Sequence, residues 1–227
     1  MVRYADETKS DYNAFYSADF GTASSRPALT ITYKYAYYMM SKNSPGDDHS
    51  FVFNQANIVP GNYQAYKHAD KDAATMLAAM KISTVFVYRG DGTQTYVLAG
   101  NSTQMTRANV LAMPAGALSH VKLVLYACCE AGKDWENGAN LVNATYNRGA
   151  KCVVGFGLKT YCPELNMWTI QFMQSLASGK TINAAMDAAD AVVSNAIKNN
   201  VFPYSPYRGY TAKKYRTVCG NAAVSVS

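Results

Sequence analysis

Two adjacent cysteines are the residues of this sequence best placed for nucleophilic chemistry. Cys128 and Cys129 end an apolar run that starts at Val121, and Glu130 and Gly132 then lead into a polar segment. Such a run is typical of a buried central strand, and α/β folds place their sites at the ends of these strands. A thiol at this place is either a nucleophile or a small buried side chain with no catalytic role.

A second apolar run, residues 82–88, leads into the turn Arg89-Gly90-Asp91-Gly92. The carboxyl ends of parallel strands emerge at one edge of a sheet, so we expect this turn to lie beside the cysteines. A cysteine nucleophile needs a group that takes its proton and donors for an oxyanion. Arg89-Gly90-Asp91 is also an integrin-type tripeptide, but such triplets arise by chance, and we prefer the catalytic-loop interpretation.

Metal and cofactor chemistry find little support in the sequence. The five cysteines include no C-x-x-C pair, and the histidines, His49, His68 and His120, are far apart. We therefore predict no zinc site, no disulfide framework and no cofactor.

Composition indicates one globular domain with a sizeable core, since the 227 residues are 49% apolar and only 16% charged. The net charge of +6 comes from scattered Lys and Arg, with one cluster at 213–216, so we expect no nucleic-acid partner. No apolar run approaches the roughly 20 residues of a membrane span. No signal peptide follows Met1, so the chain is either cytosolic or cut from a longer precursor.

The apolar patterns predict alternating strands and helices. Strands are expected over 35–40, 62–67, 82–88, 96–98, 121–126 and 149–155, with an edge strand within 211–218. Helices are expected over 47–59, 69–80, 105–113, 135–147, 163–178 and 182–197. This order predicts an α/β fold with a mostly parallel sheet and helices on both faces. The helix from Trp135 would present its N-terminus to Cys129, which lowers a thiol pKa.

Residues 121–190 resemble the caspase-like cysteine peptidases of clan CD, in particular the CHAT type. Members carry "LxxLSACETG", "GAxxVVGxxW" and "xFYxxLxxGKSVxxALxxA", in this order. The matching segments here are LVLYACCEAG at 123–132, GAKCVVGF at 149–156 and FMQSLASGKTI at 172–182, followed by AAMDAA at 184–189. The resemblance implies a caspase-like three-layer αβα sandwich around a mostly parallel sheet.

The resemblance also implies the site. Cys129 falls on the nucleophile, and the backbone N–H groups of Gly92 and Cys129 would bind the oxyanion. The family's His-Gly dipeptide falls on Asp91-Gly92, so Asp91 occupies the position of the general base. The residues expected to bind substrate are Arg89, Gly90, Glu130, Phe156 and Gly157. Tyr161, Cys162 and Trp168 follow the strand at 149–155, and either line the substrate pocket or pack a helix onto the sheet.

Asp91 decides between two functions. An anionic carboxylate beside Cys129 would raise the thiol pKa and could not protonate a leaving amine. General acid–base help contributes roughly 100- to 10,000-fold. One hypothesis is a cysteine endopeptidase domain that is inactive or impaired, with peptide or protein substrates; the other is a non-catalytic peptide- or protein-binding module. Asp91 is either natural or engineered, and among the histidines His68 is the best candidate for a substitute base.

Residues 1–34 differ from the rest of the chain, which suggests two domains, 1–34 and 35–227. The segment Phe15–Tyr33 resembles the last strands of a DNRLRE-type β-sandwich, a module of secreted, cell-wall-associated bacterial proteins. An ordinary N-terminal hairpin is the alternative. The resemblance implies a secreted or surface-attached bacterial parent protein, and a cytoplasmic location also stays open. The oligomeric state is not indicated.

Overall fold

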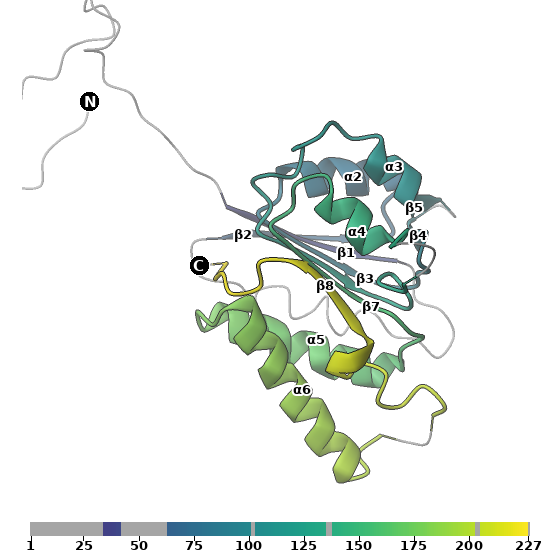
Figure 1. The fold of residues 1–227 in the computed structure, drawn as a ribbon, viewed down its shortest axis with the longest axis vertical. Coiled ribbons are helices and arrows are strands. Elements are labelled where there is room, and N and C mark those ends of the chain that lie inside the picture. Colours follow the sequence, from purple (N-terminus) through teal and green to yellow (C-terminus); the bar gives the residue numbers. More distant parts are fainter. Residues whose placement is uncertain (1–33, 42–62, 101–102, 135–137, 203–204, 227) are drawn as a thin grey trace, which may run out of the picture. The chain divides into compact units, whose positions relative to one another are not determined.

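A six-stranded sheet forms the centre of the structure, a computed structural model that describes residues 34–41, 63–100, 103–134, 138–202 and 205–226 (Figure 1). These residues belong to one compact unit. The predicted N-terminal module, the helix expected over 47–59 and His49 lie outside the described residues. The two-domain division therefore stays a prediction.

The sheet has the strand order β2-β1-β3-β6-β7-β8. Its first five strands run parallel, and only the edge strand β8 is antiparallel to its neighbour β7. The prediction of a mostly parallel sheet with an edge strand near the C-terminus is thus confirmed. The strands are β1 (Tyr35–Met40), β2 (Gln64–Ala69), β3 (Val85–Arg89), β6 (Leu123–Ala127), β7 (Cys152–Phe156) and β8 (Arg216–Gly220).

Helices cover both faces of the sheet, as predicted for a three-layer sandwich. Helices α2, α3 and α4 lie over one face, and the longer α5 and α6 lie over the other (Figure 1). A short hairpin of β4 and β5 stands apart from the main sheet. These elements are α2 (Ala73–Ile82), β4 (Tyr96–Leu98), β5 (Gln104–Thr106), α3 (Arg107–Leu111), α4 (Leu141–Tyr146), α5 (Cys162–Ala177), α6 (Ile182–Lys198) and the 3₁₀ turn η2 (Lys213–Tyr215).

The central strands explain why the sheet forms where the sequence predicts it. Every residue of β3, β6 and β7 is buried. Successive side chains of β6 enter opposite cores: Leu123 and Leu125 pack with α5 and α6, and Val124 and Tyr126 pack on the other face. Burying each large side chain contributes about 1.5–3 kcal/mol. Strands with both faces buried require the continuous apolar runs seen in the sequence.

One predicted helix begins later than expected. The helix predicted over 135–147 starts at Leu141, where the Asn140 side chain accepts the N–H of Asn143. Residues 138–140 are not helical, and Gly138 has a φ of +79°. The helix therefore begins at Leu141, and its effect on the Cys129 thiol stays a prediction. Asparagine at the N-cap and a glycine in a left-handed turn are the local causes.

No helix in the described ranges is long and apolar enough to cross a lipid bilayer.

Candidate active site

The predicted site residues come from three neighbouring strands and meet at the carboxyl edge of the sheet. Arg89, the last residue of β3, pairs with Ala127, the last residue of β6. The amide of Gly90 donates to the Ala127 carbonyl at 3.4 Å. Strand β7 then places Phe156 and Gly157 on the other side of β6. The structure thus brings together the two turns that the sequence places 30 to 40 positions apart.

The two adjacent cysteines have opposite surroundings. Cys128 is fully buried, and a Cβ atom on Gly92 would lie 2.7 Å from its sulfur. Burial raises the pKa of the Cys128 thiol well above its usual value; Cys129 and Asp91 add to this, and the Arg89 charge opposes it. Cys129 is only partly buried. The accessible thiol is therefore the one that the family register assigns to the nucleophile.

Thr160 contacts the Cys129 thiol. Its backbone N–H donates to Cys129 Sγ at 3.4 Å, and its hydroxyl lies 3.7 Å from the same sulfur. Thr160 stands just before α5, whose first residue is Cys162. Helix α5, for which the sequence predicts no role at the thiol, therefore begins close to Cys129. A backbone donor next to a helix N-terminus is a common setting for reactive thiols.

The turn that carries Asp91 is held by its own backbone. The Tyr88 hydroxyl donates to the carbonyl of Asp91 at 2.8 Å, and the Leu98 amide donates to the same carbonyl at 2.9 Å. The flanking bond runs from the Thr93 amide to the Tyr96 carbonyl. None of these three bonds uses the N–H of Gly92, the predicted oxyanion donor. Within the described residues, this N–H takes part in no backbone hydrogen bond.

Close packing explains both glycines of the turn. A Cβ atom on Gly90 would collide with the Ser41 side chain and the Tyr88 hydroxyl. One on Gly92 would meet Cys128 Sγ at 2.7 Å and Val97 Cγ1 at 3.2 Å. The match to the family's glycine positions is therefore also a packing requirement of this fold.

Two residues predicted to bind substrate have their side chains in the interior. Phe156 is fully buried and packs edge-on against Trp168, with 5.2 Å between ring centroids. Arg89 is 4% exposed, and its guanidinium is bound by two backbone carbonyls, an amide oxygen and a thiol. Direct substrate contact by these two side chains is therefore not what the geometry favours.

Besides Gly90, the two remaining residues predicted to bind substrate, Glu130 and Gly157, lie at the rim of the candidate site. Glu130 has a φ of +55°, which turns the chain sharply after Cys129, and its carboxylate pairs with Lys133 at 2.7 Å. Gly157 donates its amide to the Tyr215 carbonyl at 2.6 Å. A non-glycine residue in the left-handed region is strained, and such strain concentrates at functional sites.

Sequence reasoning missed Thr160 and Asn166. It also did not decide whether Tyr161, Cys162 and Trp168 line a substrate pocket or pack α5 onto the sheet. Trp168 is fully buried between Phe156 and Phe172, so it packs α5 onto the sheet. Cys162 is buried against Arg89. No pattern in the sequence marks Thr160; its only signal is its place in the loop that leads from β7 into α5.

The described histidines do not take the place of a base at Asp91. His68 lies on β2, three strands from β6, which is about 14 Å at roughly 4.8 Å a step. Its ring stacks on Tyr37, with 5.9 Å between centroids. His120 is exposed and precedes β6, at the opposite end from Cys129. Among the residues that the structure describes, no three His, Cys, Asp or Glu side chains cluster as metal ligands would.

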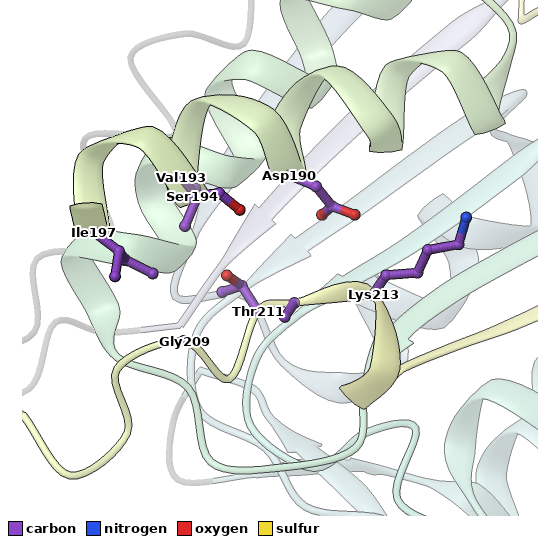
Figure 2. A pocket seen from close by; sticks show the side chains of 8 residues that line it. Asp190, Val193, Ser194, Ile197, Gly209, Thr211 and Lys213 are labelled. Atoms are coloured by element: carbon purple, nitrogen blue, oxygen red, sulfur yellow. The ribbon is translucent and has the colours of Figure 1, made fainter. Parts of the chain in front are cut away.

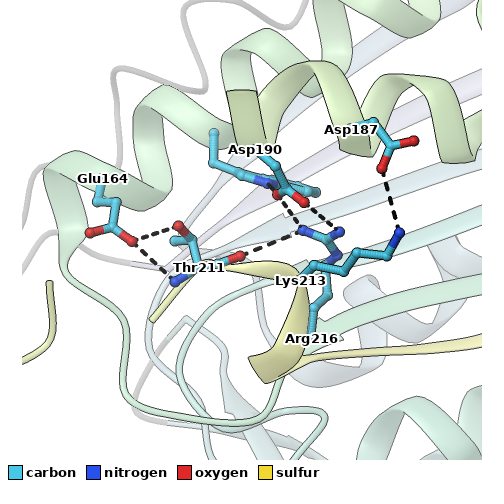
Figure 3. A network of polar contacts seen from close by, with 7 residues as sticks. Glu164, Asp187, Asp190, Thr211, Lys213 and Arg216 are labelled. Atoms are coloured by element: carbon cyan, nitrogen blue, oxygen red, sulfur yellow. Dashed lines mark hydrogen bonds and ion pairs between the residues drawn. The ribbon is translucent and has the colours of Figure 1, made fainter. Parts of the chain in front are cut away.

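A buried polar network holds the chain that leads to Tyr215 (Figure 3). Glu164 is fully buried and accepts from the amides of Gly209 at 2.7 Å and Thr211 at 3.0 Å. Arg216 binds both oxygens of the Asp190 carboxylate, at 2.6 and 3.0 Å. Asp190 also accepts from the indole N–H of Trp168 at 2.7 Å. The network thereby fixes the segment whose Tyr215 carbonyl supports Gly157.

A pocket of about 210 Å³ lies between α6 and residues 209–213 (Figure 2). Val193 and Ile197 form part of its wall, with Asp190 and Lys213 at its polar side. None of its lining residues is a predicted site residue, and Asp190 is already bound by Arg216. We therefore keep the candidate site at Cys129.

Comparison with known proteins supports the fold. No family model and no curated protein matches the sequence. Among solved structures, the Arg-specific cysteine proteinase gingipain R superposes with a TM-score of 0.65 at 13% identity, over 83% of this chain and 46% of that one. The fold is that of the caspase-like cysteine peptidases. A complex of the pro- and mature domains of Porphyromonas gingivalis RgpB gives the same TM-score at 12% identity, covering 83% and 47%.

A more distant match is the Saccharomyces cerevisiae separase–securin complex, with a TM-score of 0.51 at 14% identity, over 87% of this chain and 12% of that one. This chain thus spans less than half of the gingipain chains that it matches. Identities this low establish the caspase-like fold alone. The CHAT subtype, the DNRLRE-type segment and the extracellular location stay predictions.

Proposed function

We propose that this chain is a caspase-like cysteine endopeptidase domain that binds peptide segments beside Cys129 and cuts them poorly or not at all. The observation that carries the proposal is the partly exposed Cys129 thiol at the carboxyl end of β6, between the Asp91 turn and Thr160. Solved structures with this fold include cysteine proteinases, which supports the assignment of the reaction class.

In this proposal Cys129 Sγ attacks the carbonyl carbon of a peptide bond. The resulting oxyanion is bound by the N–H of Gly92 and the N–H of Cys129, neither of which makes a backbone hydrogen bond within the described residues. The thiol must lose a proton before attack, and the leaving amine must gain one. The family assigns both transfers to the histidine whose position Asp91 occupies here.

Asp91 cannot carry out both transfers at neutral pH. A carboxylate is unprotonated there, so it has no proton for the leaving amine, and its charge disfavours a thiolate nearby. We expect the remaining activity to come from oxyanion binding and peptide positioning. The same argument favours the alternative function, in which the chain binds peptides or proteins at this edge without cleaving them.

Restoring histidine tests the proposal. The Asp91→His variant should cleave a mixed peptide library about 100- to 10,000-fold faster than the unmodified chain, because it regains general acid–base help. Cleavage is measured by mass spectrometry of the products, which also reveals the residue before the cut.

Asp91→Asn is the matched control, since it removes the charge without adding a base, and it should stay close to the unmodified chain. Asp91→His/Cys129→Ala should lose the gained activity. Peptide cleavage that persists without Cys129, or a folded Asp91→His variant without any gain, would overturn the endopeptidase assignment.

A further inference from the structure

The guanidinium of Arg89 lies beneath the two turns of the candidate site. Arg89 is 4% exposed, and each of its three nitrogens is in contact with the protein. Nη1 donates to the carbonyls of Gly90 and Ala127, both at 3.4 Å. These carbonyls belong to the Asp91 turn and to the strand end that precedes the cysteines. One nitrogen therefore bridges the ends of β3 and β6.

The other two nitrogens reach the first turns of α5. Nε donates to Asn166 Oδ1 at 2.9 Å, and Nη2 contacts Cys162 Sγ at 2.7 Å. Asn166 also lies within 3.8 Å of the Cys162 sulfur. Helix α5 is the element that follows Thr160, the residue that donates to Cys129 Sγ. A single planar side chain thus joins all three walls around the Cys129 thiol.

No carboxylate among the described residues forms an ion pair with Arg89. The ion pairs of the described residues are Lys133–Glu130, Lys213–Asp187 and Arg216–Asp190. A buried guanidinium that is held by carbonyls, an amide and a thiol is costly, because its lost hydration is repaid only by neutral groups. Its retained positive field falls on the adjacent turns, where it opposes the rise in the Cys128 pKa.

We propose that Arg89 is the positioning residue of the site: its fork fixes the Asp91 turn and the cysteine turn against α5. This inference deepens the proposed function and rests on it only for the identity of the nucleophile. The fork geometry is required because lysine, a point charge, can reach one of these acceptors at a time.

Two variants test the fork. Arg89→Lys keeps a cation and loses the fork, so amide hydrogen exchange in residues 90–92, 128–132 and 159–162 should become about tenfold faster. Arg89→Met loses all of these hydrogen bonds, so exchange in the same segments should be at least as fast as in Arg89→Lys. Iodoacetamide alkylation of Cys129 in Arg89→Met, mapped by mass spectrometry at one fixed pH, should also become faster, because the thiol is no longer held against Thr160.

Arg148 supplies the control. It donates to the Met113 carbonyl at 3.1 Å at the other end of the sheet, so Arg148→Lys should leave exchange around the site unchanged. Both readouts are independent of peptide cleavage, so they stand even if Asp91→His gains no activity. If Arg89→Met unfolds, Arg89→Lys decides. Unchanged exchange in the three segments of folded Arg89→Lys, or an unchanged rate of Cys129 alkylation in folded Arg89→Met, would overturn the proposal.

Discussion

Two buried arginines of this molecule are held in contrasting ways. Arg216 has a side chain that is 2% exposed, binds both oxygens of Asp190 and lies over the Trp168 ring at 5.1 Å. Arg89 also has a buried guanidinium, but it binds carbonyls, an amide and a thiol. The Arg216 charge is neutralised by the Asp190 carboxylate. The Arg89 guanidinium lies instead beside the backbone of the candidate site.

The comparison teaches that burial alone does not assign a role to a charged residue. An ion pair such as Arg216–Asp190 ties α6 to β8 and contributes to the fold. A buried guanidinium that is bound by neutral groups contributes little to the free energy of unfolding, because its desolvation is costly. We therefore assign Arg89 to the positioning of the two turns of the site. The variants below are ordered by the size of their expected effect.

The largest effect is expected from breaking the Arg216–Asp190 pair. Arg216→Met should lower the free energy of unfolding by about 2 to 4 kcal/mol, because it leaves the Asp190 carboxylate partly buried without its cation. Urea denaturation measures this loss. Alkylation of Cys129 should remain as in the unmodified chain. A stable Arg216→Met variant with altered alkylation would reverse the roles that we assign to the two arginines.

The turn above Arg89 offers the next test. Gly92→Ala places a methyl group against Cys128 Sγ, at 2.7 Å before any adjustment, and should cost about 1 to 3 kcal/mol. Cys128→Ala in the same chain should relieve that cost, giving a coupling energy of at least about 0.5 kcal/mol in a double-mutant cycle. Additive effects would mean that the Asp91 turn does not rest on Cys128.

These contacts show how far the sequence could predict the molecule. The apolar runs before Arg89, Cys128 and Phe156 located the three central strands within a few residues, because fully buried strands require them. The same runs also predicted that the Asp91 turn and the cysteine turn lie at one edge of the sheet.

The side-chain and backbone contacts that hold the candidate site could not be predicted from the sequence. The contact of Thr160 with Cys129 depends on how the loop after β7 returns over β6, and the helix predicted from Trp135 begins only at Leu141. Arginine next to a catalytic-type turn suggests substrate binding; only the three-dimensional contacts to Cys162 and Asn166 show it turned inward.

A smaller effect is expected in how the stability of the fold depends on pH. Burial raises the pKa of Cys152 to about 12, with Cys219 as a second cause and no cation to oppose it, unlike Cys128 beside Arg89. The unfolded thiol loses its proton from about pH 8.5, so the folded state binds more protons above that pH. The contribution of the buried Cys152 thiol to the free energy of unfolding is complete below pH 8.5 and declines as pH rises toward 12.

The stability advantage of the unmodified chain over Cys152→Ala should therefore shrink by about 1 kcal/mol between pH 9 and pH 10. Urea unfolding of both chains at these two pH values measures it. An advantage that stays constant or grows with pH would show that Cys152 titrates as an exposed thiol does.

The most direct test of the account is the order in which the native thiols react. Iodoacetamide is added to the folded chain at neutral pH, and each cysteine is followed by peptide mass spectrometry. Cys129, which is partly exposed and bound by the Thr160 amide, should be modified first, and the fully buried Cys128 should react only when the protein unfolds. Modification of Cys128 before Cys129, or at the same rate, would contradict the assignment of Cys129 as the nucleophile of the site.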